Sequence, residues 1–334
     1  MSNTILVTGG AGFIGSELVS QLAEEGCEVR VVDNLVNGKR SNLAHLDPLR
    51  VQFSAVDIRD RTTMARLLKG VDVVYHLACL GVRHSLHAPA ENNDVNATAT
   101  LGLLEMARAA GVARFVYVSS SEVYGTARWV PMDEDHPAFP MTVYGAGKLA
   151  GECYTRAYFH SYGYPTVVVR PFNAFGPRSH HEGDSGEVIP KFMLRAMAGK
   201  PLVIFGDGKQ TRDFTYVADT ARGIRLAGEI DAAIGQTLNI GQGSEITIRH
   251  LADQVCAVVG RADAQLVHDA PRPGDVLRLF ADSARARSLL GFEPTVSLAD
   301  GLQRLHRWYV ETGAPPEKML ADERIHNWML DEAS

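Results

Sequence analysis

The stretch "TILVTGGAGFIG", residues 4–15, joins a run of aliphatic and β-branched residues to a glycine-rich turn. Gly9, Gly12 and Gly15 are spaced Gly-x-x-Gly-x-x-Gly, directly after an expected strand and at the start of a helical pattern. Glycine at these points allows a tight turn, close approach of a pyrophosphate and close helix–strand packing. The N–H groups at the helix start can bind phosphate oxygens. The stretch therefore predicts a dinucleotide-binding strand–turn–helix unit.

Strand and helix patterns alternate through the first half of the chain. Short runs rich in Val, Phe and Tyr predict buried parallel strands near residues 4–9, 27–33, 51–58, 71–78, 114–120 and 165–172. Helix-period segments lie between these runs, which is typical of a doubly wound α/β sheet of the Rossmann type. We expect this domain to cover residues 1–175, with a returning segment at about 236–260. Residues 176–235 and 261–330 are expected to form a smaller mixed α/β lobe.

The composition argues against several classes of protein. The 334 residues carry a net charge of -6 and no dense run of Lys or Arg, which disfavours nucleic-acid and anionic-membrane partners. Four widely spaced cysteines form no CxxC pair, as in a reduced protein. No leader pattern is present, and no apolar run reaches the roughly 18 residues that span a bilayer. We expect a soluble, cytoplasmic protein.

The polar loop around residues 176–187 contains His180, His181, Glu182 and Asp184. These residues lack helical spacing and a cysteine partner, so a solvated loop is a better interpretation than a metal site. We therefore predict no metal. A loop of this length can also close over a ligand as a lid.

Two acidic residues follow expected strands near the glycine turn. Asp33 comes about 20 residues after the turn, where a carboxylate can accept hydrogen bonds from both ribose hydroxyls of a dinucleotide. Because it would repel a 2′-phosphate, it favours NAD over NADP, and Arg40 is the main feature against this. Asp57 is placed to reach the adenine edge, and the alternative is that it caps a helix.

Three residues in the middle of the chain form a candidate proton relay. Tyr144 and Lys148 are four residues apart, which puts both side chains on one helix face. A nearby ammonium lowers the pKa of a tyrosine, which is otherwise a poor base at pH 7. Ser120 ends an expected strand at the sheet edge where ligands bind. Together these residues can remove or restore a hydroxyl proton while a hydride moves to nicotinamide.

With these features in place, the chain resembles the extended short-chain dehydrogenase/reductase family of nucleotide-sugar epimerases, dehydratases and decarboxylases. The resemblance rests on "VTGGAGFIG", "HLA", "SSSEVYG", "YGAGK", "RPFNAFGPR" and "RDFTYVAD", and it extends from residue 5 to beyond residue 300. It implies a Rossmann domain that holds NAD tightly and a C-terminal lobe that holds a UDP-sugar. It also implies a homodimer formed through the helices expected at 99–111 and 147–163.

Family positions matched in this sequence imply a set of site residues. The catalytic residues would be Ser120, Glu122, Tyr144 and Lys148. Cofactor contacts would come from Gly9, Gly12, Phe13, Ile14, Gly15, Asp33, Asn34, Asp57, Ile58, Leu77, Ala78, Asn96, Ser119, Tyr144, Lys148 and Pro171. Substrate contacts would come from Arg83, Ser121, Asn173, Arg178, Val188, Arg212 and Arg272. Asn173, Arg212 and Arg272 would bind the diphosphate, since guanidinium groups pair with phosphates; alternatively, Arg212 forms a surface ion pair with Asp213.

Glu122 bears on the choice of reaction. The family's first step oxidises C4 of the sugar to a ketone, and returning the hydride to the other face epimerises C4 with no need of a glutamate. Dehydration across C5–C6 needs a base and an acid, and the Asp–Glu pair that dehydratases use is incomplete here because Ser121 replaces the Asp. Decarboxylation of a C5 carboxylate leaves an enolate that must be reprotonated. Alternatively, Glu122 is a structural carboxylate that caps a helix or turn.

The sequence around Glu122 favours UDP-glucuronate decarboxylation, giving UDP-xylose or UDP-4-keto-pentose. Ser121-Glu122 before Val-Tyr-Gly and the "QTR" at 210–212 resemble the decarboxylases. A 4-epimerase acting on a UDP-hexose or UDP-hexuronate is the alternative, since "YGAGKL" and "GVRHSLHAP" at 81–89 resemble epimerases. Residues 122–137 also resemble dehydratases of N-acetylated sugars. A non-catalytic NAD-binding scaffold is disfavoured because Ser120, Tyr144 and Lys148 are all present.

Overall fold

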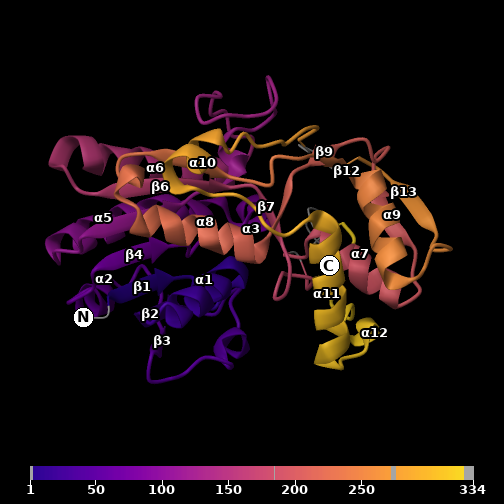
Figure 1. Ribbon diagram of the computed structural model, residues 1–334, viewed down its shortest axis with the longest axis horizontal. Coiled ribbons are helices and arrows are strands. Elements are labelled where there is room, and N and C mark those ends of the chain that lie inside the picture. Colours follow the sequence, from indigo (N-terminus) through magenta and orange to yellow (C-terminus); the bar gives the residue numbers. More distant parts are fainter. Residues whose placement is uncertain (1–2, 184, 272–275, 327–334) are drawn as a thin grey trace.

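The computed structural model describes residues 3–183, 185–271 and 276–326 (Figure 1). Its central sheet has seven parallel strands in the order β11-β6-β5-β4-β1-β2-β3. The strands are β1 (Thr4–Thr8), β2 (Glu28–Asp33), β3 (Val51–Ala55), β4 (Val73–His76), β5 (Arg114–Val118), β6 (Thr166–Pro171) and β11 (Thr237–Ile240). The expected strands and the doubly wound α/β fold are confirmed. The sequence order reverses between β1 and β4, and ligands bind at such a switch point.

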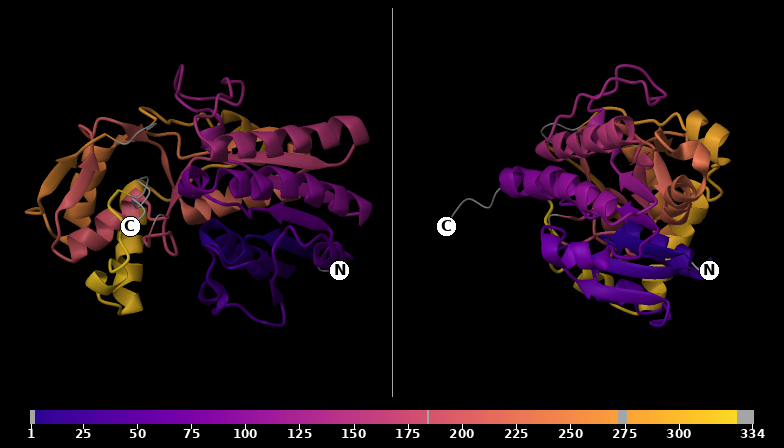
Figure 2. Two further views of the ribbon diagram at one scale, coloured as in Figure 1. Left: turned by 180° about the vertical axis from the view of Figure 1, so that it is seen from behind. Right: turned by 90° about the vertical axis from the view of Figure 1, so that its left-hand side faces the viewer.

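Helices cover both faces of this sheet (Figures 1 and 2). One face packs against α2 (Arg61–Leu67), α5 (Ala99–Ala109) and α6 (Val143–Tyr162). The other face packs against α1 (Phe13–Glu24), α8 (Val217–Glu229) and α10 (Ala284–Leu290). The central strands are apolar on both sides because both faces are covered, which is why they appear in the sequence as continuous hydrophobic runs.

A second hydrophobic core lies beside the sheet, at the right of Figure 1. It joins α7 (Val188–Met197), α9 (Ile248–Val259), α11 (Leu298–Thr312) and α12 (Pro316–Met319). The paired strands of this lobe are β8 (Leu202–Phe205) with β13 (Leu266–Asp269) and β9 (Thr211–Arg212) with β12 (Ile246–Thr247). The pair β7 (Asn173–Phe175) and β10 (Phe214–Tyr216) connects the two cores.

The packing moves three helices across the division expected from the sequence. Helices α8 and α10 lie within 176–235 and 261–330 but pack on the central sheet. Helix α9 lies within 236–260 but packs in the lobe with α7 and α11. Only β11 of the returning segment joins the central sheet. The chain therefore crosses between the two parts more often than its composition indicates.

The connection after β4 is helical and lies at the switch point. It consists of α3 (Val82–His87) and α4 (Pro89–Asn93), followed by α5. Within the part of the chain that the structure describes, no helix has the length and apolar character needed to cross a bilayer.

Candidate active site

A cavity of about 1430 Å³ lies between the carboxyl ends of the central strands and the lobe. This exceeds the roughly 300–1,000 Å³ that encloses one small ligand, so the cavity has room for a dinucleotide together with a second large ligand. Most of the residues that the sequence predicts for the site line it. They are Gly9, Gly12, Phe13, Ile14, Gly15, Asp33, Asn34, Asp57, Ile58, Leu77, Ala78, Arg83, Ser119, Ser120, Ser121, Glu122, Tyr144, Lys148, Pro171, Asn173, Val188 and Arg212.

The glycine turn forms a close-fitting cradle at one end of the cavity. Gly9 has φ +71°, and a Cβ there would lie 2.7 Å from the backbone nitrogen of Ala78. A Cβ on Gly15 would lie 2.1 Å from the Gly9 carbonyl oxygen. Helix α1 begins at Phe13 without a side-chain cap, so its first N–H groups face the cradle. The turn therefore fits a dinucleotide pyrophosphate.

Asp33 lies at the ribose end of this cradle and is nearly buried. Its carboxylate accepts hydrogen bonds from the N–H of Ala11 at 3.0 Å and from the N–H of Leu35 at 2.8 Å. A Cβ on Gly38 would approach the same carboxylate to 2.8 Å, so glycine keeps this side open. Arg40 packs over the ring of Phe53 at 5.4 Å and is not among the residues lining the cavity. The argument for NADP is thereby weakened.

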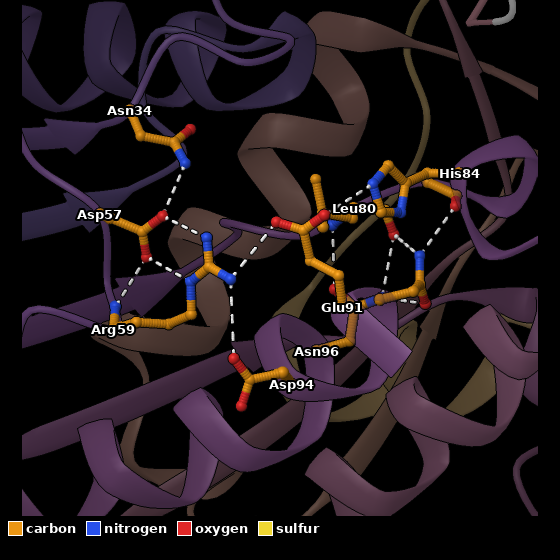
Figure 3. Close-up of polar contacts among 10 residues, drawn as sticks. Asn34, Asp57, Arg59, Leu80, His84, Glu91, Asp94 and Asn96 are labelled. Atoms are coloured by element: carbon orange, nitrogen blue, oxygen red, sulfur yellow. Dashed lines mark hydrogen bonds and ion pairs between the residues drawn. The ribbon is translucent and has the colours of Figure 1, made fainter. Parts of the chain in front are cut away.

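The adenine end carries an ion-pair network that extends from Asp57 (Figure 3). Arg59 donates to the Asp57 carboxylate from Nε at 3.0 Å and from Nη2 at 2.8 Å, and Asn34 donates at 3.0 Å. The Arg59 hydrogen bond is the main reason that the pKa of Asp57 falls to about 2. Asp57 caps no helix, because Asp60 is the N-cap of α2. The first of the two sequence interpretations of Asp57 is therefore favoured.

The network continues toward the helices after β4. Arg59 Nη1 lies 3.4 Å from Glu91 and 3.6 Å from Asp94, and His84 Nε2 lies 3.5 Å from the other oxygen of Glu91. Figure 3 shows Arg59 and Glu91 between Asp57 and His84, with Asp94 to one side of Arg59. The pairs are largely exposed, so each contributes little alone. They link the adenine end of the site to the segment that carries Arg83.

The three candidate relay residues meet at the middle of the cavity. Thr142 caps α6 by accepting from the N–H of Gly145 at 3.1 Å, which places Tyr144 in the first helical turn. Ser120 follows β5 and shares a hydrogen bond with the Tyr144 hydroxyl. Lys148 is 2% exposed and donates from Nζ to the Val118 carbonyl at 2.8 Å. Strand end and helix thus bring Ser120, Tyr144 and Lys148 together.

The electrostatics of Tyr144 differ from the sequence expectation. Burial raises the pKa of Tyr144 well above its usual value, with further contributions from Cys79 and from the carboxylate of Glu122. A side-chain interaction with Ser120 opposes this rise. Lys148 donates to a backbone carbonyl on β5, which fixes its ammonium group against the strand.

A buried network fixes the helix that carries Tyr144 and Lys148. Arg170 on β6 donates to Glu152 on α6 from Nε at 2.9 Å and from Nη2 at 2.7 Å. The same guanidinium donates to the Tyr124 hydroxyl at 2.8 Å. Glu152 lies four residues after Lys148, so this pair sets the position of the catalytic helix on the sheet.

Glu122 and Ser121 form one short turn beside the relay. The Glu122 N–H donates to Ser120 Oγ at 3.2 Å, and the Glu122 carboxylate is close enough to act on the pKa of Tyr144. Ser121 is buried and lines the cavity. The Glu122 carboxylate thus lies near Tyr144, while the preceding residue, Ser121, supplies only a hydroxyl group.

The lobe supplies the opposite wall of the cavity. Arg212 on β9 lines the cavity, whereas Asp213 is buried and accepts from the N–H groups of Gln242, Gly243 and Ala281 at 2.9–3.1 Å. The surface pair of Arg212 with Asp213 is therefore wrong, because the carboxylate binds backbone. Asn173 lines the cavity with a buried oxygen that has no partner among the described residues.

Two predicted contacts are placed elsewhere, and the position of a third is not described. Asn96 is buried and bonds to Leu80 and to Asn92, so it holds the turn after β4 instead of lining the cavity. Arg178 pairs with Glu17 on α1 and is likewise not among the lining residues. Arg272 lies outside the described residues.

The structure adds residues that the sequence did not single out. Cys79 lines the cavity and shares a hydrogen bond with the Tyr144 hydroxyl. Glu187 lines the cavity at the start of α7, and Glu323 and Arg324 line it from the segment after α12. Only Cys79 had a signal in the sequence, since it directly follows the "HLA" motif. The part of the chain that the structure covers holds no cluster of metal-binding side chains.

Comparisons with known proteins agree with this geometry. A family model described as GDP-mannose 4,6 dehydratase matches residues 6–305. The UDP-glucose 4-epimerase of Mycolicibacterium smegmatis is 38% identical over 303 residues, 90% of this chain and 96% of that protein. The UDP-glucuronic acid decarboxylase 1 of Danio rerio is 34% identical, covering 91% and 72%. A structure of dTDP-glucose 4,6-dehydratase from Streptomyces venezuelae with NAD bound has a TM-score of 0.87 at 36% identity, covering 92% and 97%.

Proposed function

Since the chain belongs to the extended short-chain dehydrogenase/reductase family of nucleotide-sugar epimerases, dehydratases and decarboxylases, we propose that it is an NAD-dependent UDP-sugar 4-epimerase. The observation that carries the proposal is the set of side chains at the reacting centre. Ser120, Tyr144 and Lys148 all line the cavity there, while the Asp–Glu pair that dehydration needs is incomplete because Ser121 stands in place of the Asp. The proposal departs from the decarboxylation that the sequence favoured.

NAD fits the cradle of Gly9, Gly12 and Gly15 with its ribose at Asp33, and when bound it accepts a hydride from C4 of the sugar and can return it. Tyr144 and Ser120 share a hydrogen bond, so the pair can take the O4 proton during oxidation and give it back during reduction. Lys148 is buried beside them and supplies positive charge close to the phenol.

Dehydration receives less support from this site. Expelling the C6 hydroxyl needs an acid next to the base that removes the C5 proton, and the position beside Glu122 is the buried hydroxyl of Ser121. A serine hydroxyl is too weak an acid for this step.

Decarboxylation is the second candidate, and Glu122 is the observation that favours it. Its carboxylate acts directly on Tyr144, where it could repel a substrate carboxylate or reprotonate the enolate. The identity to the UDP-glucuronic acid decarboxylase 1 of Danio rerio, 34% over 312 residues, is lower than the 38% over 303 residues to the epimerase of M. smegmatis.

One incubation series separates the three reactions. Purified protein with NAD is mixed with UDP-glucose, UDP-N-acetylglucosamine or UDP-glucuronate, and the products are followed by mass spectrometry and proton NMR. Epimerisation leaves the mass unchanged and shifts the C4 proton signal. A product lighter by 44 mass units from UDP-glucuronate means decarboxylation and would refute the proposal, as would a product lighter by 18.

We also propose that the protein is a cytoplasmic homodimer. The outer surfaces of α5 and α6 expose Leu101, Val143 and Tyr162, which suits a contact between copies through these two helices. All four cysteines are unpaired, as in a reducing compartment. Sedimentation at micromolar concentration tests the assembly, and a mass near 36.3 kDa would contradict it.

A further inference from the structure

A short segment between β2 and β3, residues 36–42, borders the ribose end of the cofactor cradle. Its first three residues line the cavity beside Asp33. Its second part crosses the glycine turn, because the N–H of Lys39 and the side-chain amide of Asn42 both donate to the Ala11 carbonyl, at 3.0 and 2.9 Å. A dinucleotide with its ribose at Asp33 therefore contacts this segment, which we call the ribose flap.

The ribose flap has little packing of its own to hold it in place. Within residues 34–42, all of which the structure describes, no side chain is buried. The only regular structure there is the start of one 3-10 turn, Arg40–Leu43. Segments with few buried apolar contacts open locally at a low cost in free energy. Contacts from another part of the chain therefore decide how firmly the flap stays closed.

Arg178, in the loop after β7, supplies two such contacts. Its Nη1 donates to the Asn42 carbonyl on the flap at 3.3 Å, and its Nη2 forms an ion pair with Glu17 on α1. The side chains of Arg178 and Glu17 are only 14% and 18% exposed, so water and salt screen the pair weakly. Arg178 therefore fastens the flap to the helix that begins at the glycine turn.

The loop that carries Arg178 is fixed to both parts of the molecule. Arg178 itself has φ +70°, a left-handed conformation that is strained for a residue with a side chain and that occurs at ligand clamps. Glu182 forms an ion pair with Lys39 on the flap. The N–H of Gly183 donates to the Asp322 carbonyl at 3.0 Å, which ties the loop to the segment after α12. The loop thus holds the flap at two points and is itself held by the lobe.

We propose that Arg178 and Glu182 form a latch that keeps the ribose flap closed beside bound NAD and sets the rate of cofactor exchange. Neither residue is among those that line the cavity, so both act through the flap and not on NAD itself. Removing the latch therefore speeds the entry and the release of NAD together and changes its affinity little. This role differs from the sugar contact that the sequence implied for Arg178. The inference rests on NAD binding and on none of the three sugar reactions.

Exchange of labelled NAD tests the latch. Protein loaded with radiolabelled NAD is diluted into excess unlabelled NAD, and the retained label gives the release rate constant; quenching of tryptophan fluorescence gives the entry rate constant. Arg178→Gln and Glu17→Gln are each expected to raise both rate constants by about tenfold or more and to leave Kd within about threefold. Arg178→Lys keeps the charge and should restore part of the slow exchange. Glu182→Gln, which breaks a more exposed pair, should have a smaller effect, roughly two- to threefold.

Arg225→Gln is the matched control. Arg225 is 15% exposed and pairs with Glu25, which follows the far end of α1, about 18 Å along the helix from the cradle. This variant removes a similarly covered arginine from the same helix and should leave both rate constants unchanged.

Unchanged rate constants in both Arg178→Gln and Glu17→Gln would overturn the inference. A Kd raised by about tenfold with unchanged entry would also overturn it, because Arg178 would then shape the bound cradle without gating it. If Arg178→Gln fails to fold, as judged by circular dichroism, Glu17→Gln decides alone. A protein that exchanges NAD as expected but epimerises none of the three sugars would contradict the proposed function and leave the latch supported.

Discussion

Replacing Glu152 by glutamine is expected to lower the free energy of unfolding by about 3–5 kcal/mol. The carboxylate is fully buried and receives two hydrogen bonds from Arg170, at 2.9 and 2.7 Å. Hydrogen bonds between charged groups contribute about 1.5–3 kcal/mol each, and the variant leaves a buried guanidinium without its counter-charge. Guanidinium unfolding followed by far-UV circular dichroism measures the change. Because Glu152 holds the helix of Tyr144 and Lys148, kcat should fall as well.

A matched exposed pair provides the control for this prediction. Arg61 and Glu105 approach to 2.6 Å with side chains 56% and 62% exposed, so Glu105→Gln should cost no more than about 1 kcal/mol. The double variant Glu152→Leu with Arg170→Met removes both charges and should recover much of the lost stability. If Glu152→Gln is no more destabilising than Glu105→Gln, the buried pair does not fix the catalytic helix and the reasoning fails.

Three further changes test the site. Glu122→Gln removes a charge that raises the pKa of Tyr144, so the limb of the rate–pH profile that reports Tyr144 should move to lower pH. The maximal rate should stay within about tenfold of the wild-type rate, whereas a loss beyond about 100-fold means that Glu122 itself transfers protons. Asp33→Asn should weaken NAD binding by roughly 10- to 100-fold and weaken NADP binding less, as measured by fluorescence titration. Burial lowers the pKa of His76 to about 3, so below pH 6.5 this histidine is protonated in the unfolded chain but stays neutral in the native protein. The free energy of unfolding of the wild type should therefore fall by about 2 kcal/mol between pH 7.5 and pH 5. This part of the fall should be absent in His76→Asn.

The sequence was sufficient for the sheet and for the parts of the site that depend on local spacing. Each buried parallel strand is a short apolar run, and the six runs expected in the first half of the chain are all strands of the central sheet. The glycine turn and the four-residue spacing of Tyr144 and Lys148 are also local features. Ser120 could be placed because parallel strands all end at one edge of the sheet.

Properties that depend on contacts distant in sequence could not be predicted in this way. Lys148 donates to the Val118 carbonyl 30 residues away, so the position of its ammonium depends on the strand as well as on the spacing from Tyr144. Asp213 follows Arg212 directly, yet its carboxylate binds backbone N–H groups about 30 and 70 residues further along the chain. The Asn96 side chain is used up in hydrogen bonds to the backbone of Leu80, in a turn whose shape depends on packing. Sequence spacing identifies which residues belong to a site. Burial and partners distant in sequence decide the charge state of each side chain and the way it is oriented.

The choice among the three reactions depends on residues of this second kind. All three share oxidation at C4, so the motifs that carry Ser120, Tyr144 and Lys148 cannot distinguish them. The presence of Glu122 suits chemistry at C5. A carboxylate beside the relay also acts without accepting a proton, because its negative charge raises the pKa of Tyr144. The Asp–Glu pair of the dehydratases is incomplete because Ser121 stands in place of the Asp, whereas the three residues of the relay that inverts C4 are all present in the cavity. Epimerisation needs no group beyond that relay, which is why the proposed function rests on it.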